Sequence, residues 1–92
     1  MKYTPQKQRS IVNRNIRQST FSLMSILGAN ISRIETMAVE RANTLGLEEY
    51  GDKSFHYDSD KLLEEIFEEL ADAIFYNCIR MEQANRGITI LP

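Results

Sequence analysis

The chain has little of what stabilises small proteins through disulfides or metals. Cys78 is its only cysteine and His56 its only histidine, so it can form no internal disulfide and lacks the Cys/His cluster of a zinc site. It has no tryptophan, and no apolar run reaches the roughly 18 residues of a membrane-spanning helix. The N-terminus also lacks the apolar stretch of a signal peptide. We therefore expect a cytoplasmic protein without membrane contact.

The overall composition is that of a folded protein. The 92 residues are 42% hydrophobic and 26% charged, which is typical of one globular domain. A domain over residues 1–92 buries only a modest part of its surface, and neither a disulfide nor zinc compensates for that. We therefore predict that the protein is a homo-oligomer.

Charge is distributed unevenly along the chain. The basic N-terminal segment, residues 1–18, has no acidic residue and carries Lys2, Lys7, Arg9, Arg14 and Arg17. From Gly46 to the end there are eleven acidic and four basic residues. Such a segment could contact nucleic acid or an acidic protein partner, or pack on the acidic helix of this same protein, in its own or a neighbouring subunit. We favour the last interpretation, because no aromatic stacking platform accompanies the basic residues.

Helical patterns dominate the first half of the sequence. Thr4 and Pro5 predict a helix start, with Thr4 as N-cap, and residues 19–20 predict either a break or the start of the next helix. Apolar residues then recur at steps of three and four over residues 24–45, which predicts one helix of about 25 residues that Gly46 ends. Gly28 and Asn30 could instead split it.

A polar stretch separates this pattern from a second one. Residues 47–60 predict mostly loop, with a short extended piece at residues 55–57. Asp58 to Asp60 offer an N-cap for a helix from about Lys61 to Asn85, which Gly87 ends before an extended tail. The expected fold is all-α: a small helical bundle with two main antiparallel helices, completed by oligomerisation.

The second helix carries a dense group of acids, here called the acidic face: Glu64, Glu65, Glu68, Glu69 and Asp72. These acids lie opposite an apolar side, as in any amphipathic helix with a solvated face. However, several of these carboxylates repel each other at i,i+4 spacing. The one nearby compensating charge is that of Lys61, four residues before Glu65. The helix then becomes apolar on all sides, which predicts burial there and places Glu69 and Asp72 at the edge of a packed region. A divalent cation such as Mg²⁺ would offset that cost.

These residues resemble a known family. The segment Glu69-Leu70-Ala71-Asp72 is similar to the ExxD half of the motif in MazG-like all-α nucleoside triphosphate pyrophosphohydrolases, and short phage-encoded relatives carry a segment like YGDKSF before it. Residues 48–52, EEYGD, resemble the first half, EExGE, with Asp52 in place of its last Glu. Gly51 and Ser54 favour a loop where the family has a helix. Glu35 and Glu40 are alternative first-half acids, but they lie about 140° apart on a helix.

The resemblance implies a function and a site. It implies Mg²⁺-dependent hydrolysis of nucleoside triphosphates to the monophosphate and pyrophosphate by a dimer or tetramer. Glu69 and Asp72 would be catalytic. The implied metal ligands are Glu65, Glu69, Asp72, Glu49 and Asp52. The implied substrate-binding residues are Tyr76, Asn77 and Lys61.

Two non-catalytic alternatives stay open. One is a module that binds a nucleotide or a protein without hydrolysis, which the loop-like EEYGD segment favours. The other is a small phage-type inhibitory protein whose acidic helix imitates phosphates, which the dense acids favour and the basic segment disfavours. A P-loop is absent, and Cys78 lies on the apolar side without a nucleophile motif.

Overall fold

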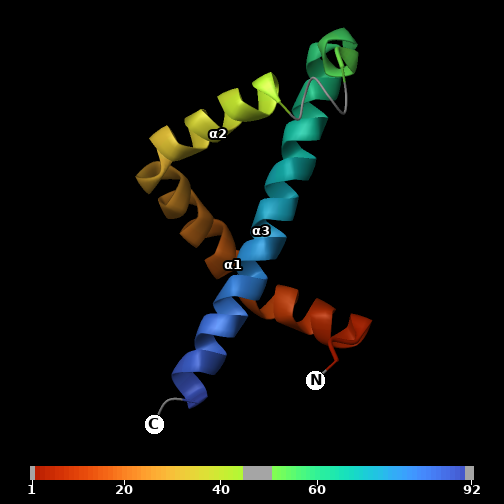
Figure 1. The fold of residues 1–92 in the computed structure, drawn as a ribbon. Coiled ribbons are helices and arrows are strands. Elements are labelled where there is room, and N and C mark those ends of the chain that lie inside the picture. The colour runs from red at the N-terminus through yellow and green to blue at the C-terminus, as the bar shows by residue number, and fades with distance from the viewer. Residues whose placement is uncertain (1, 45–50, 91–92) are drawn as a thin grey trace.

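The computed structural model describes residues 2–44 and 51–90, and side chains as far as residue 85. In these ranges the chain forms α1 (Pro5–Ala29), α2 (Ile31–Asn43), the short 3₁₀ helix η2 (Lys53–His56) and α3 (Ser59–Ile90), and no strand. Figure 1 shows α1 crossing the long α3 near its middle, while α2 runs back toward the start of α3. The all-α prediction is confirmed. The described helices form an open frame rather than two antiparallel neighbours.

α1 begins as the sequence predicts but ends elsewhere. The Thr4 hydroxyl accepts a hydrogen bond of 3.2 Å from the Lys7 backbone N–H, and Pro5 occupies the first turn. The predicted break at residues 19–20 is wrong, because α1 continues to Ala29. A continuous helix over residues 24–45 does not form; the alternative prediction, a split at Asn30, is confirmed. The Asn30 side chain donates to the Ile26 carbonyl at 2.8 Å, and this local bond competes with helix continuation.

Residues 51–58, which lead into α3, are partly helical. Gly51 has a φ of 56°, which glycine adopts without strain. The extended piece predicted at residues 55–57 is instead η2, which ends at His56. Asp58 caps α3 as predicted, accepting a hydrogen bond of 2.8 Å from the Lys61 N–H. The predicted stop at Gly87 is wrong, since α3 extends to Ile90.

Polar residues hold α1 against α3 where the helices cross. The Ser19 hydroxyl donates to the Ile74 carbonyl at 2.9 Å, and the Asn77 amide donates to the Ser19 carbonyl at 3.0 Å. Beside them, Glu82 accepts hydrogen bonds from Arg14 at 2.7 Å and from Asn15 at 3.3 Å. Because each bond requires one relative placement of the helices, this seam fixes how they cross.

The apolar core is very small. Among the described residues, Ile11 and Cys78 are the only buried hydrophobic side chains. The chain exposes 7960 Å², whereas a compact monomer of its 10.6 kDa mass exposes about 5,500 Å². Its radius of gyration is 16.7 Å, against about 12 Å for a compact domain of this length. A single copy therefore leaves much apolar surface in contact with water.

The seam yields a stability prediction. We expect Asn77→Ala to lower the free energy of unfolding by about 1–3 kcal/mol, because it removes the bond to Ser19 and leaves Arg80 without its amide acceptor. The matched control is Asn13→Ala, which changes an exposed asparagine of α1. Urea unfolding followed by circular dichroism measures both. Equal effects of the two substitutions would contradict the assigned role of Asn77.

Candidate functional site

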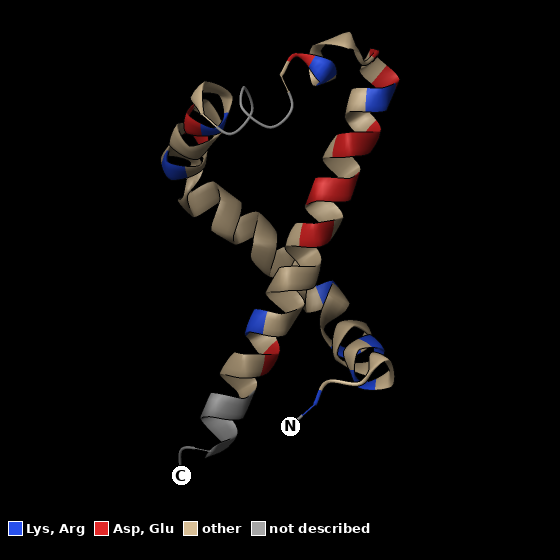
Figure 2. Cartoon of the chain, turned by 45° about the vertical axis from the view of Figure 1, so that its right-hand side comes forward, with Lys and Arg blue, Asp and Glu red and all other residues tan. Residues whose placement is uncertain are grey.

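The acidic face occupies the first half of α3 on the far side of the crossing from the basic segment. Figure 2 shows its acids as successive bands along α3. Glu64, Glu68, Glu69 and Asp72 are exposed and Glu65 is half-buried. Of these five acids, Glu65 alone forms an ion pair within the described ranges, at 3.1 Å to Lys61. The hydrogen bond and charge of Glu65 hold the pKa of Lys61 above its ordinary value. As predicted, Lys61 is the one basic side chain that pairs with these acids among the described residues.

Two of these acids border an open apolar groove on α3. The groove is lined by Leu62, Ile66 and Leu70 together with Glu65 and Glu69. Asp72 lies within about 60° of both acids around the helix, since residues advance about 100° each. The burial predicted after Asp72 is only partial: Asn77 and Cys78 are buried, whereas Tyr76 is 68% exposed. Among the described residues the groove itself is uncovered, since Ile66 is 52% exposed.

The acids do not converge on one point within a single chain. Across residues 2–44 and 51–90, no three Asp, Glu, His or Cys side chains lie close enough together to enclose a metal ion. Asp52 pairs instead with His56, its carboxylate lying 3.0 Å from the ring Nε2. Glu49 lies outside the described residues. The described residues of one chain therefore offer a row of carboxylates that would supply only a few of the ligands of a Mg²⁺ ion.

The three predicted substrate-binding residues have different surroundings. Tyr76 is 68% exposed, and its ring contacts that of Phe75 at 6.0 Å between centroids. Lys61 is held by Glu65, and its ammonium lies 5.2 Å from the centroid of the Tyr57 ring. Asn77 is buried in the seam, where both ends of its amide are bonded. Tyr76 and Lys61 are thus accessible from solvent, whereas Asn77 holds the fold together.

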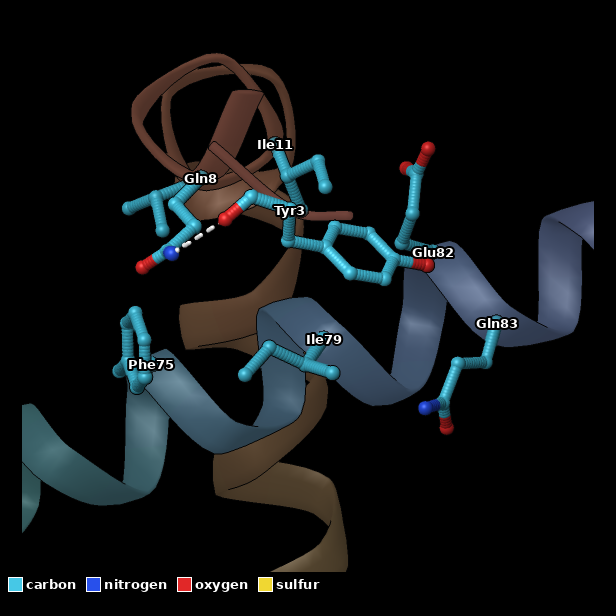
Figure 3. A pocket seen from close by; sticks show the side chains of 8 residues that line it. Tyr3, Gln8, Ile11, Phe75, Ile79, Glu82 and Gln83 are labelled. Atoms are coloured by element: carbon cyan, nitrogen blue, oxygen red, sulfur yellow. Dashed lines mark hydrogen bonds between the residues drawn. The ribbon is translucent and has the colours of Figure 1, made fainter. Parts of the chain in front are cut away.

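A separate cavity of about 240 Å³ lies where the start of α1 meets the second half of α3. Figure 3 shows Phe75 on one side and Glu82 and Gln83 on the other, with the Tyr3 ring and Ile79 between them, and Gln8 bonded to the Tyr3 carbonyl at 2.8 Å. Its lining residues are Tyr3, Gln8, Ile11, Val12, Phe75, Ile79, Glu82 and Gln83. Sequence reasoning missed this cavity, because it depends on α1 crossing α3. It contains none of the acidic face.

Comparisons with known proteins do not extend these observations. No protein-family model, no curated protein and no solved structure matches the chain. Among the helices of the described ranges, none combines the length and apolar character needed to cross a membrane.

Proposed function

We propose that the protein is a cytoplasmic, homo-oligomeric MazG-like protein that binds a nucleoside triphosphate with Mg²⁺ on the acidic face and hydrolyses it to the monophosphate and pyrophosphate. One observation carries the proposal: Glu65 and Glu69 border an exposed apolar groove, with Asp72 on the same stripe of α3. If a second helix covers this apolar surface, the neighbouring carboxylates become partly buried. A bound cation would then offset the cost of burying their charge. The ExxD resemblance of Glu69 and Asp72 supports the same function.

The open row of carboxylates fits the coordination habits of Mg²⁺. Mg²⁺ keeps several waters and usually takes one or two protein carboxylates together with substrate phosphates. Glu69 and Asp72 lie one helical turn apart and would supply these two carboxylates, with Glu65 beside them. When bound, Mg²⁺ would supply neutralisation of phosphate charge and activation of water. In the hydrolysis, a water oxygen would form a bond to the α-phosphorus and lose a proton to solvent, while the bond from the α-phosphorus to its bridging oxygen breaks and pyrophosphate leaves.

Other residues of α3 would position the substrate. Tyr76, exposed one turn beyond Asp72, would stack on the base. Lys61 would exchange its bond with Glu65 for a phosphate oxygen. Asn77 is not part of this site, because its amide holds α1 against α3.

A non-catalytic interaction protein is the second candidate. The absence of a closed metal group among the described residues and the large exposed apolar surface favour it. Such a protein would use the same helix to hold a nucleotide or a protein without turnover.

A screen of nucleoside triphosphates with Mg²⁺ separates the candidates. We expect pyrophosphate release with at least one nucleotide, together with a rise in melting temperature, because ligands that bind only the folded state stabilise it. EDTA should abolish both signals. A thermal shift without turnover would support the binding module instead. If neither signal occurs with any nucleotide, the proposed nucleotide function is wrong.

A further inference from the structure

A single copy exposes surface on the scale of a subunit interface. The exposed area exceeds that of a compact monomer of this mass by about 2,500 Å². Obligate homodimers bury about 2,000–5,000 Å² in total over both partners. The excess therefore matches what one subunit contributes to a large interface of this kind.

Exposed large apolar side chains occur on α1, on α2 and along α3. Every residue of α2 is exposed, including Ile31 at 55% and Met37 at 50%. A helix of 13 residues is only marginally stable in water without packing. The first half of α3 exposes Leu63, Ile66 and Phe67 in the same way. Both elements therefore need a partner that covers them.

The charges identify the partner as a second copy of the chain. Arg9 and Arg17 lie on the side of α1 opposite Ile11, Asn15 and Ser19, since residues advance about 100° each. Both arginines are exposed, and neither forms an ion pair in the described part of the chain. Glu64 and Glu68 are likewise exposed and without an ion pair there. Each chain thus carries two unpaired surfaces of opposite charge, as a self-complementary two-fold interface requires.

The crossing also places the basic segment beside the second half of α3, whereas Glu64 and Glu68 lie on its first half. Ser19 of α1 contacts Ile74 of α3, and Arg14 and Asn15 of α1 contact Glu82. Glu82 follows Ile74 by eight residues along α3. Eight residues before Ile74 is Ile66, between Glu64 and Glu68. Figure 2 shows the basic residues of α1 on one side of the crossing and these acids on the other. A second copy related by a two-fold axis, and antiparallel to the first, would therefore bring the basic segment of each copy toward the acids of the other.

We propose that two copies pack antiparallel along α3, with Arg9 and Arg17 of each copy against Glu64 and Glu68 of the other. The inference rests on the homo-oligomer of the proposed function and adds its orientation. In this arrangement Glu65, Glu69 and Asp72 remain available to bind the cation.

Charge reversal tests this arrangement. One variant carries Arg9→Glu and Arg17→Glu, and the other carries Glu64→Lys and Glu68→Lys. Each alone should dissociate with a Kd at least about tenfold higher than wild type, because like charges then face each other. Mixing the two variants restores attraction at both contacts and should return the Kd to within about threefold of wild type, as should one chain with all four substitutions. Sedimentation equilibrium measures the Kd, and circular dichroism checks that each variant is helical.

Controls and contrary results separate the inference from the proposed function. The variant with Arg9→Glu and Arg17→Glu, mixed with wild-type chain, should pair with a Kd between those of the two homodimers, because one contact is repulsive and the other attractive. A wild-type chain that stays monomeric at micromolar concentration would overturn both the homo-oligomer and this arrangement. A wild-type dimer without rescue in the mixture and in the four-substitution chain would overturn only the arrangement. The nucleotide function is read separately, from the Mg²⁺ response of wild type.

Discussion

Removing residues 1–18 is expected to lower the melting temperature by about 10 °C or more. The deletion takes away Ile11, one of two buried hydrophobic side chains in the described residues, and the Arg14 and Asn15 bonds to Glu82. Loss of a buried isoleucine side chain alone costs about 2–5 kcal/mol, and in a domain of this size each kcal/mol corresponds to about 4–8 °C. Differential scanning calorimetry of the deleted and full chains measures the change.

Point variants separate packing from charge in this prediction. Ile11→Ala should reproduce much of the loss, whereas the matched substitution Ile16→Ala should cost little, because Ile11 is 8% and Ile16 42% exposed. Arg9→Gln with Arg17→Gln should leave α1 packed and make the melting temperature less sensitive to salt. An unchanged melting temperature after deletion would show that the basic segment is not part of the folded unit.

Local chemistry made the helix starts predictable from sequence. Thr4 and Asp58 are caps whose side chains bond the backbone three residues later, and such signals lie within one turn. The end of α1 was not predictable from periodicity, because the apolar spacing continues through Asn30 while its side chain bonds Ile26. Local and longer-range signals disagree at this position, and the local bond prevails.

The packing seam was hidden from sequence reasoning for a different reason. Asn15, Ser19 and Asn77 are buried, although polar residues of these types usually lie on the surface. No periodic apolar pattern marks them, and their bonds join residues more than fifty positions apart. The acidic face, in contrast, was fully predictable as a face, because its members share one helix. What surrounds that face depends on how helices pack, which its own spacing does not encode.

Asp72→Asn is expected to abolish the stabilisation that Mg²⁺ or Mn²⁺ gives to the protein. At a cation concentration a hundredfold above the Kd, a site present only in the folded state stabilises by about 2.7 kcal/mol, which is about 10–20 °C here. Asp72 shares a stripe with Glu65 and Glu69 and has no basic partner among the described residues. The asparagine variant removes a charged ligand, so the rise in melting temperature should disappear together with any pyrophosphate release.

The same variant behaves differently in metal-free buffer. There Asp72→Asn should be neutral or slightly stabilising, because it removes repulsion with Glu68 at i,i+4 spacing. Asp60→Asn at the start of α3 is the matched control, since it neutralises an exposed acid outside the acidic face and should leave the divalent response intact. A purely solvated face would give no specific cation effect in either variant. If Asp72→Asn keeps the full divalent response, then Asp72 is not a metal ligand and the hydrolytic function proposed for this face fails with it.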